Sequence, residues 1–390
     1  MAGRIGMEGS IRLEKATCVI IGAGVMGCSI AYHLAKKKFK DVILLEKEFI
    51  ASKATGVCPG GIRQQWSSKL GCLLSKDSVA FFKNLDEELH PEFPLSFVQS
   101  GYLFLAYSDV VLGAYRQNVA LQNSFGIPSE ILSAEQIKEL IPAINITGIS
   151  GGAYCKEDGY LEDCSGFTNN LASRARTMGA RIIYDEAMQI LLEGNRVVGV
   201  RGKKDVYRCE TIVNAAGCDA APLAASIGIH LPIVVGKRRL LYTQRVEDHF
   251  LSPCLATLEK GWGGKQLHEG HVYMAYIAEE AEKLSNMEFV ERSVELGTEI
   301  IPRLGETRIH RLQEGYYDIT PDDNPILGKE EGLDGYFHAV GFSGHGFMLS
   351  PAVGMAMAQL IGREEPFVDL TEWSLNRFRD RSIRRERLVL

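Results

Sequence analysis

The sequence predicts an α/β protein in which a Rossmann-like nucleotide-binding domain carries an inserted domain built on an antiparallel sheet. An unbroken apolar run at 18–21 leads into a glycine-rich turn and a helix, as expected for a buried strand of a parallel sheet. A second strand, glycine-rich turn and helix follow at 336–361. Between 232 and 310 the pattern changes to alternating segments such as RRLLYTQRV and GHVYMAYIAEE, which are typical of antiparallel strands.

Composition limits the class of protein. With 390 residues the chain is long enough for about two domains. The net charge of −6 argues against nucleic acid as a partner, and no apolar run approaches the roughly 18 residues of a membrane span. The first 13 residues lack the apolar stretch of a signal peptide, and the nine scattered cysteines form no CxxC pair. We therefore expect a cytoplasmic protein without a metal site.

The nucleotide-binding domain is expected to be discontinuous, from residues 14–90, 150–225 and 311–375. After the strand at 18–21 we expect a helix over 25–37, with small or apolar residues toward the sheet, and a strand over 42–45. Apolar spacing predicts further elements in order: helices at 75–89 and 167–178, a strand at 181–184, a meander at 188–193, 196–202 and 206–210, strands at 211–216 and 336–340, and a helix from 347.

The inserted substrate domain is expected from residues 91–149 and 226–310. Its first part should hold a strand over 97–107, where apolar residues alternate, and helices over 115–125 and 134–140, the second after Ser133 as N-cap. Residues 1–13 and 376–390 are expected to be terminal tails. The run RFRDRSIRRERLVL at the end alternates Arg with acids, as in a solvated segment; docking to a partner subunit is the alternative.

The first glycine-rich turn predicts a phosphate-binding site. Gly22, Gly24 and Gly27 fit GxGxxG: the first permits the tight turn, the second lets the backbone approach a pyrophosphate, and the third allows close helix–strand packing. The helix N-terminus then faces the phosphates with its partial positive charge. Glu46 ends the second strand, where a carboxylate accepts hydrogen bonds from ribose hydroxyls. The expected ligand is FAD or NAD.

The segment ASKATGVCPGGIRQQWS at 51–67 favours FAD over NAD. A nicotinamide enzyme needs no second glycine-rich loop directly after the ribose acid. A flavin is a longer ligand, and its ribityl chain and ring need backbone amides farther along the chain. The alternative interpretation is a mobile surface loop.

The sequence resembles FAD-dependent amino-acid oxidoreductases of the D-amino-acid oxidase, glycine oxidase and sarcosine oxidase family. The resemblance covers about residues 15–370 and rests on GAGVMGCSIAYHLA with Glu46, TGVCPGGIRQQ, IVNAAG, YYDITPDDNPILG and GFSGHGFMLSPAVG. Within that family, GGIRQQWS and the last motif look closest to the β subunits of heteromeric sarcosine oxidases, dye-linked proline dehydrogenases and hydrogen cyanide synthases.

The resemblance implies a non-covalent FAD held by both ends of the chain. The first turn would bind its diphosphate. The last turn, with the helix from Phe347, would direct backbone amides at the flavin edge that becomes negative on reduction. The expected FAD contacts are Gly22, Ala23, Gly24, Val25, Met26, Gly27, Glu46, Lys47, Ser52, Ala54, Thr55, Gly60, Gly61, Ile62, Met188, Ala216, Gly217, Gly341, Ser343, Gly344, His345, Gly346, Phe347 and Met348.

The resemblance also implies oxidation of the C–N bond of an amino acid to an imine, with hydride passing to flavin N5. The substrate would be a secondary or imino-type amino acid such as proline or sarcosine, or glycine. The expected catalytic residues are Arg63, Tyr317 and His345. Arg63 would bind both oxygens of the substrate carboxylate, or it would only hold its own loop in place. Tyr317 would line the substrate cavity or belong to the core, and His345 would face the flavin or point away as a turn residue.

Two questions stay open at the level of sequence. Tyr273, Tyr276, His268 and His271 lie on or beside one inserted strand, and alternation does not identify its cavity face. In related heterotetrameric sarcosine oxidases an FMN is tied to a histidine before the helix expected at 167–178. Here that segment, GYLEDCSGFTNN, holds a cysteine and no histidine. A covalent FMN is therefore not expected, while FMN at a subunit interface stays open.

Two other functions are compatible with the fold: oxidation of a hydroxy acid or glycerol phosphate, and a non-enzymatic assembly factor that keeps FAD for structure. A phosphate substrate would need a basic cluster, for which GKRR at 236–239 is the only candidate, and we expect it on a surface strand. Asp322 and Asp323 are expected to form a turn before Pro325. The leading hypothesis is the catalytic subunit of a heteromeric amino-acid dehydrogenase or oxidase that passes electrons to a partner.

Overall fold

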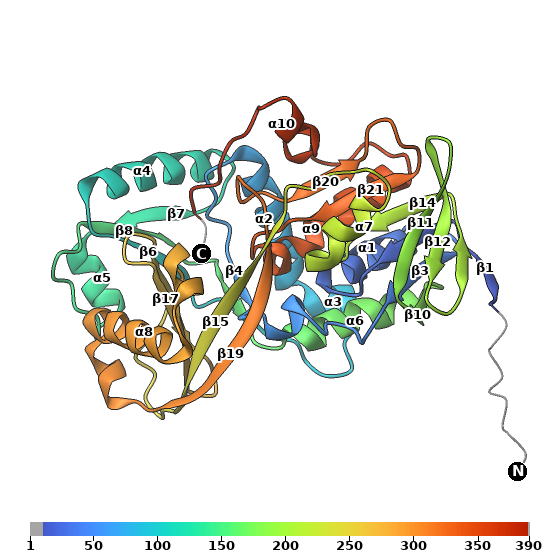
Figure 1. The fold of residues 1–390 in the computed structure, drawn as a ribbon. Coiled ribbons are helices and arrows are strands. Elements are labelled where there is room, and N and C mark those ends of the chain that lie inside the picture. Colours follow the sequence, from blue (N-terminus) through green and yellow to red (C-terminus); the bar gives the residue numbers. More distant parts are fainter. Residues whose placement is uncertain (1–10, 389–390) are drawn as a thin grey trace, which may run out of the picture.

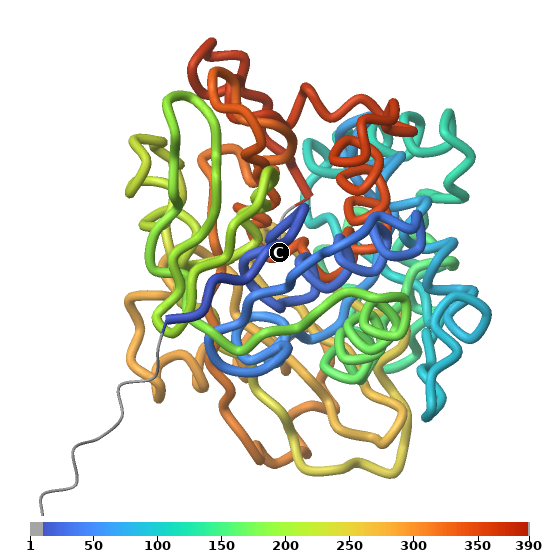
Figure 2. Tube along the Cα trace, turned by 90° about the vertical axis from the view of Figure 1, so that its right-hand side faces the viewer, coloured from blue at the N-terminus to red at the C-terminus, as the bar shows by residue number. Residues whose placement is uncertain are grey.

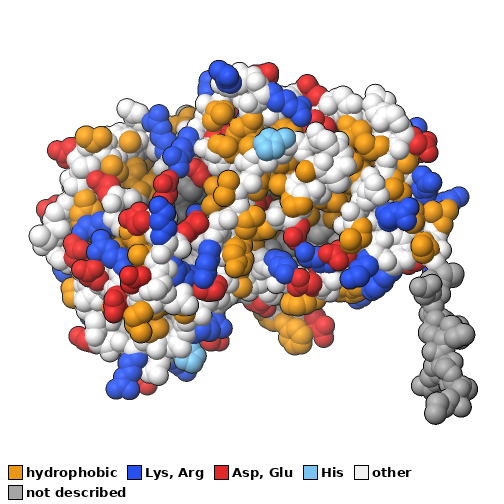
Figure 3. All heavy atoms as spheres, in the orientation of Figure 1, with side chains coloured by type: hydrophobic (Ala, Val, Ile, Leu, Met, Phe, Trp, Pro, Cys, Tyr) orange, Lys and Arg blue, Asp and Glu red, His pale blue; other side chains and the backbone are white. Residues whose placement is uncertain are grey.

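The computed structural model describes residues 11–388, and the chain forms two halves, each built around one large sheet (Figure 1). Two long strands, β15 (Val234–Arg245) and β19 (Ile309–Ile319), lie where the halves meet. Basic and acidic side chains are mixed over the face shown in Figure 3. Among the described residues no helix is long and apolar enough to cross a membrane. Residues 1–10 of the expected N-terminal tail lie outside the described part.

The first half contains the predicted Rossmann-like sheet. Its strand order is β10-β3-β2-β14-β21-β20, with bounds Arg181–Tyr184, Val42–Glu46, Cys18–Ile21, Thr211–Asn214, Tyr336–Val340 and Ile326–Lys329. Neighbouring strands are parallel, except that β20 runs antiparallel to β21. Blue, green and red segments therefore adjoin in this half, because strands from the start, middle and end of the chain pair directly (Figure 2). The α/β prediction is confirmed.

Both faces of this sheet are covered, which explains why its central strands are apolar throughout. Cys18 and Ile20 pack against the helical face, and Val19 and Ile21 pack against the opposite face. The helical face carries α1 (Val25–Lys36), α2 (Lys69–Lys83), α3 (Leu85–Leu89), α6 (Cys164–Thr177) and α9 (Gly346–Ile361). The opposite face carries α7 (Ala220–Ala225) and a four-stranded sheet of β1 (Leu13–Lys15), β13 (Val206–Arg208), β12 (Arg196–Gly202) and β11 (Ala187–Glu193).

Small side chains let α1 and α9 approach closely. Ser29 Oγ donates a hydrogen bond to Ser350 O at 2.6 Å. A Cβ on Gly354 would lie 2.1 Å from Ser29 Oγ, so only glycine fits there. Because each helix begins at one of the two glycine-rich turns, this contact helps to bring the turns to one edge of the sheet.

The second half is an eight-stranded sheet with flanking helices. The order is β19-β15-β18-β17-β16-β6-β8-β7, where β18 is His271–Tyr276, β17 Trp262–Gln266, β16 Cys254–Thr257, β6 Tyr102–Ala106, β8 Gly151–Cys155 and β7 Ser129–Leu132. Only the β16–β6 pairing in this sheet is parallel. The flanking helices are α4 (Asp109–Ser124), α5 (Ala134–Leu140) and α8 (Asn286–Ile300). A third, small sheet contains β4 (Gly61–Ile62), β9 (Gly159–Leu161) and β5 (Phe97–Val98).

Several predicted elements need correction. Within the region expected to alternate as strands, α8 begins at a capping box formed by Ser285 and Glu288, a local signal for a helix. The strand predicted at 97–107 is interrupted at Gly101, which has a φ of +82°. The domain boundaries expected at 150 and 311 do not match the pairing, because β8 and β19 belong to the eight-stranded sheet.

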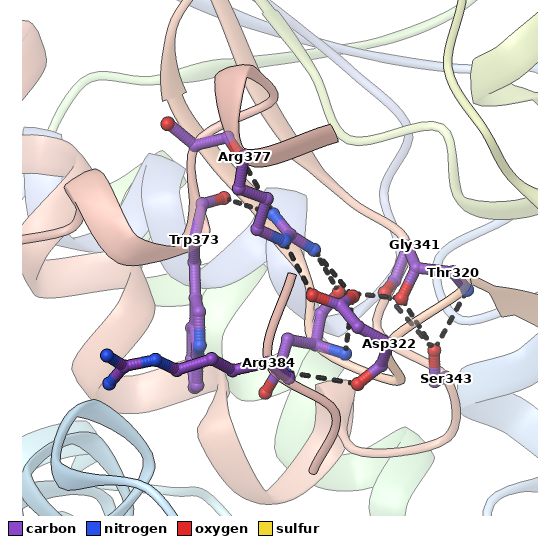
Figure 4. Close-up of polar contacts among 9 residues, drawn as sticks. Thr320, Asp322, Gly341, Ser343, Trp373, Arg377 and Arg384 are labelled. Carbon is purple, nitrogen blue, oxygen red and sulfur yellow. Dashed lines mark hydrogen bonds and ion pairs between the residues drawn. The ribbon is translucent and has the colours of Figure 1, made fainter. Parts of the chain in front are cut away.

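The C-terminal segment is not the solvated tail that its charges suggested. Arg377 is 4% exposed, and its guanidinium donates to both carboxylate oxygens of Asp322 at 2.8 and 3.0 Å (Figure 4). Arg385 Nε donates to Asp323 at 2.8 Å. The two aspartates therefore do more than shape a turn: they anchor α10 (Asn376–Arg379) and the residues after it.

Candidate active site

A cleft of about 880 Å³ opens at the carboxyl ends of the central parallel strands, where open α/β sheets bind ligands. Both glycine-rich turns, the end of β3, and strands β15 and β19 contribute to its walls. The predicted site residues that line it are Gly22, Gly24, Val25, Met26, Glu46, Lys47, Ser52, Ala54, Thr55, Met188, Ala216, Gly217, Tyr317, Gly344, Gly346 and Phe347. The fold thus gathers residues from all the segments that the sequence motifs had singled out.

The first turn has the geometry of a dinucleotide cradle. Gly22 has a φ of +103°, and a Cβ there would lie 2.5 Å from Ala215 O. A Cβ on Gly27 would lie 1.9 Å from Gly22 O, so this glycine allows the helix to pack on the turn. At Gly24, by contrast, an added Cβ would meet only Thr55 Oγ1, at 3.4 Å. The backbone at Gly24 therefore faces open space in the cleft, as close approach of a pyrophosphate requires.

Glu46 is held in place at the end of β3. Its Oε2 accepts from Ala23 N and its Oε1 from Glu48 N, both at 2.8 Å. Each carboxylate oxygen keeps a further lone pair for ribose hydroxyls. Lys47 lines the cleft and pairs with Asp219 at 2.7 Å, and this partner raises the pKa of Lys47.

The last turn presents the N-terminus of α9 to the cleft. Ser343 N donates to Asp318 O at 3.0 Å and His345 N to Phe342 O at 2.8 Å, so these amides are bonded within the protein. Gly346 and Phe347 line the cleft at the start of α9. Of the three last-turn residues expected to place backbone amides near the flavin, Ser343 and His345 therefore use theirs within the protein, while Gly346 lines the cleft.

A smaller cavity of about 90 Å³ adjoins the cleft, and Cys58, Arg238, Tyr317 and Phe347 line both. The eight-stranded sheet supplies most of its wall, including Tyr102, Lys265 and Tyr273. Burial raises the pKa of Tyr317 to about 12 and raises the pKa values of Tyr102 and Tyr273 as well. These phenols are therefore neutral and can donate or accept hydrogen bonds at neutral pH.

Arg63 lines the cavity, but both of its Nη atoms are bonded to other groups of the protein. The side chain is 1% exposed, with Nη1 donating to Gln65 O and Nη2 to Leu388 O. Nη2 also lies 3.1 Å from His345 Nε2. Burial, followed by the charge of Arg63, lowers the pKa of His345 well below its usual range, so the imidazole is neutral and accepts this bond. The predicted pair of catalytic residues thus forms a buried wall beside Trp66, whose ring lies 5.1 Å from the guanidinium.

Lys265 is a buried cation in the same cavity. It is 4% exposed, and its Nζ donates to Pro59 O. Its Nζ lies 4.0 Å from the ring centre of Tyr160. Burial lowers the pKa of Lys265, although neighbouring thiols and Glu162 act in the opposite direction. No ion pair joins Lys265 to any carboxylate in the described part of the chain.

Several predicted residues lie at the edge of the site or behind it. Gly61, Arg63, His345 and Met348 line the cavity rather than the cleft. Ala23, Gly27, Gly60, Ile62, Gly341 and Ser343 line neither space. Gly60 and Gly341 serve close packing, because an added Cβ would lie 1.9 Å from Leu161 O and 2.5 Å from Thr320 Cγ2, respectively.

The residues that sequence reasoning missed come mainly from the eight-stranded sheet. Lys265, Tyr102 and Arg238 were not predicted as site residues, and Tyr273 could not be assigned to a face. Arg238 was expected on a surface strand, yet it lines both spaces and pairs with Glu282. Alternation within each strand was visible, but which face of a strand meets the cleft depends on pairing between distant strands.

Tyr276 also lines the cavity, whereas His268 and His271 do not.

Comparison with protein families and curated proteins gives consistent matches. The family model described as DAO: FAD dependent oxidoreductase matches residues 17–360. Mitochondrial dimethylglycine dehydrogenase of Mus musculus is 29% identical over 392 residues, covering 94% of this chain and 44% of that protein. Mitochondrial sarcosine dehydrogenase of Homo sapiens is 27% identical over 386 residues, covering 94% of this chain and 42% of that protein. The chain spans less than half the length of these curated relatives.

Solved structures match over nearly the whole chain. L-proline dehydrogenase from P.horikoshii superposes with a TM-score of 0.89 and 32% sequence identity, covering 96% of this chain and 100% of that one. Glycine oxidase from Geobacillus kaustophilus gives a TM-score of 0.82 and 23% identity, covering 93% of this chain and 99% of that one. The second likeness establishes the shared fold.

Proposed function

The chain belongs to the DAO family of FAD dependent oxidoreductases, and we propose that it oxidises the C–N bond of a small amino acid to an imine. FAD is its cofactor, and the cleft fits the dinucleotide at Gly24 and Glu46, where the backbone is open and a carboxylate is fixed. When bound, FAD supplies the two-electron acceptor that takes a hydride from the substrate carbon as the C=N bond forms.

The cavity that opens beside the start of α9 carries this proposal. It is small and lined by neutral phenols and by basic side chains that include Lys265, which suits a small zwitterionic substrate. The solved proline dehydrogenase is 32% identical to this chain, and the two curated relatives are named for dimethylglycine and sarcosine. We therefore propose that the substrate is an amino acid with a secondary amine, such as proline or sarcosine, or with a tertiary amine, such as dimethylglycine. Glycine is the simplest alternative.

The residues of the chain would bind and orient the substrate. Tyr317 lies between the cleft and the cavity, where its hydroxyl can hold the substrate against the cofactor. Arg63 and His345 would close the back of the cavity and exclude water, since their polar groups bond mainly to each other and to the backbone. A cytoplasmic location and a partner subunit that takes the electrons, with FMN between the subunits, are further parts of this proposal.

The decisive experiment is the visible spectrum of the FAD-loaded protein under anaerobic conditions. L-Proline, sarcosine, dimethylglycine, glycine and D-alanine are added in turn. Bleaching of the oxidised flavin band by one of them is expected, because an imine forms only if the flavin accepts the electrons. A flavin band that none of these amines bleaches contradicts the proposal.

Lactate and glycerol 3-phosphate serve as the comparison in the same experiment. Bleaching by one of these would support the hydroxy-acid alternative, and bleaching by no compound would support a structural flavin. The GKRR run does not favour a phosphate substrate. Arg238 pairs with Glu282, and Arg239 donates to Leu284 O, Ala281 O and Asn286 Oδ1.

A further inference from the structure

We propose that Lys265 is the anion-binding residue of the cavity and that it holds the carboxylate of the substrate. This inference rests on the proposed function, because it assigns a subsite within the same cavity. It also moves the carboxylate contact away from Arg63, the residue that the sequence motif had suggested.

The first argument is the state of the buried cations. Lys265, Arg63, Arg239 and Arg377 are the Lys and Arg residues that are almost fully buried among residues 11–388. Arg377 pairs with the carboxylate of Asp322, and the other two arginines each make several hydrogen bonds. Lys265 has only the bond to Pro59 O, which leaves two of its three N–H donors.

A buried ammonium without a carboxylate partner is costly, because desolvation penalises the charge. An anion that supplies the missing partner lowers this cost. Arg238, which also lines the cavity, already pairs with Glu282, and Glu162 forms no ion pair with Lys265 in the described part of the chain. The missing anion is therefore expected to come from a ligand.

The second argument is the space beside the ammonium. In the β17–β18 ladder, Lys265 pairs with Tyr273, and Gly263 pairs with Ala275 on the same face. All four residues line the cavity. A Cβ on Gly263 would meet nothing closer than Leu255 O at 3.5 Å. The sheet thus presents a cation and a phenol next to two positions without bulky side chains, which leaves room for a small carboxylate.

The third argument is that Arg63 lacks two adjacent free N–H groups with which to bind both oxygens of a carboxylate. Nη1 and Nη2 donate to the carbonyls of Gln65 and Leu388, and Nη2 also meets the ring of His345. Nε has no partner among the described residues, but a single N–H does not form the bidentate contact that makes Arg selective for carboxylates. Lys265, by contrast, has two N–H donors left, and it has no carboxylate partner among residues 11–388, unlike Arg238, which also lines the cavity but pairs with Glu282.

The test uses the FAD-loaded protein and an unreactive ligand. Cyclopentanecarboxylate has the ring and the carboxylate of proline but no C–N bond, and cyclopentanecarboxamide is its neutral counterpart. We expect the wild-type protein to bind the carboxylate more tightly than the amide. Lys265→Met should weaken carboxylate binding by about 10- to 100-fold, the range of a hydrogen bond to a charged group, and leave amide binding unchanged. Calorimetry and the shift of the flavin spectrum measure both affinities.

The matched control is Lys260→Met. Lys260 lies near the start of the same strand but pairs with Glu299 and does not line the cavity, so carboxylate affinity should stay at the wild-type value. Lys265→Arg should retain most of the affinity because it keeps the charge. If Lys265→Met fails to fold, Lys265→Gln replaces it in the same comparison.

The outcomes separate this inference from the proposed function. Equal carboxylate affinity in wild-type protein and Lys265→Met overturns the role of Lys265, even if amino acids bleach the flavin. The role of Lys265 is also overturned if Lys265→Met changes the flavin reduction potential but not the carboxylate affinity, because Lys265 would then act on the flavin rather than bind the substrate. If carboxylate binding depends on Lys265 but no amino acid bleaches the flavin, the proposed function fails and the anion subsite stands. With an oxidised amino acid, a rise in KM with little change in kcat supports the subsite.

Discussion

At the scale of single residues, two helical glycines illustrate the difference between a required and a tolerated glycine. Gly27 lies in the first turn of α1, where a Cβ would come 1.9 Å from Gly22 O. Gly113 lies in α4, where an added Cβ would meet nothing within 4 Å. The first glycine allows α1 to pack on the glycine-rich turn, and the second has no such neighbour.

Gly27→Ala is expected to destabilise the protein by about 2 kcal/mol and to lower its FAD content, because the backbone of the turn must move. Gly113→Ala should stabilise it by up to about 1 kcal/mol, since alanine favours helix. Urea unfolding and the ratio of flavin to protein absorbance measure the two effects. Similar changes in both variants would contradict the packing role of Gly27.

Two buried histidines predict a pH dependence of stability. Burial lowers the pKa of His33 to about 3 and lowers the pKa of His345 well below 6.5. Below pH 6.5 these rings take up protons only on unfolding, so the free energy of unfolding falls as the pH drops, by up to about 1.4 kcal/mol per pH unit for each ring. Burial raises the pKa values of Asp158 and Asp318 to about 6, which acts in the opposite direction. The variants must therefore be compared with the wild type.

His33→Gln and His345→Gln should each reduce the loss of stability between pH 7.5 and pH 5.5, measured by urea unfolding at both values relative to the wild-type protein. The exposed His249 supplies the control, because His249→Gln should leave the pH dependence unchanged. A histidine variant with the wild-type slope would show that the ring is charged in the folded protein.

At the scale of elements, the C-terminal segment is held by side chains rather than by its own helix. The helix α10 contains only four residues, which is too short to be stable alone. Its anchor is the buried pair of Arg377 and Asp322, and the chain then continues to Leu388, whose carbonyl accepts from Arg63. The end of the chain therefore supports the wall of the candidate active site.

Asp322→Asn is expected to cost about 3 kcal/mol, because it leaves the guanidinium of Arg377 buried without its counter-ion. The control is Glu295→Gln, which breaks an exposed ion pair with Arg292 and should cost less than about 0.5 kcal/mol. Thermal unfolding measures both variants. A small loss for Asp322→Asn would indicate that the segment is not anchored by this pair.

At the scale of the whole molecule, FAD would connect segments that are distant in sequence. The cleft is lined by the first turn, the loop near Thr55, the strand end at Ala216 and the last turn near Gly346. Strands from these regions also pair in one sheet. Binding of one ligand should therefore stabilise the whole nucleotide-binding half.

Removal of FAD is expected to lower the free energy of unfolding, and adding it back at a hundredfold excess over its Kd should restore about 2.7 kcal/mol. FMN at the same concentration should stabilise much less, because it lacks the adenosine whose ribose Glu46 would hold. Melting temperatures of the apoprotein with each flavin test this. Equal stabilisation by FMN and FAD would contradict the assignment of the first turn to the dinucleotide.

Local sequence patterns made the nucleotide-binding half predictable. The apolar run at 18–21, the spacing of Gly22, Gly24 and Gly27, and the position of Glu46 each depend on residues near in sequence. The structure confirms the strand and places these glycines and Glu46 as a turn next to the cleft. The starts of α2, α4 and α6 were placed too late, although the N-caps Ser68, Ser108 and Asp163 were present as local signals.

By itself, the sequence determined the α/β class, the glycine-rich turn between the first buried strand and helix, and the presence of strands from the start and the end of the chain in one sheet. Only the tertiary structure decided that Lys265 and Tyr273 face the cavity, that Arg63 is bonded to Leu388 O, and that the C-terminal segment packs against Asp322. The reason is physical. Turn and strand signals arise from the backbone preferences of neighbouring residues, whereas a cavity depends on the register of strands that meet only after folding.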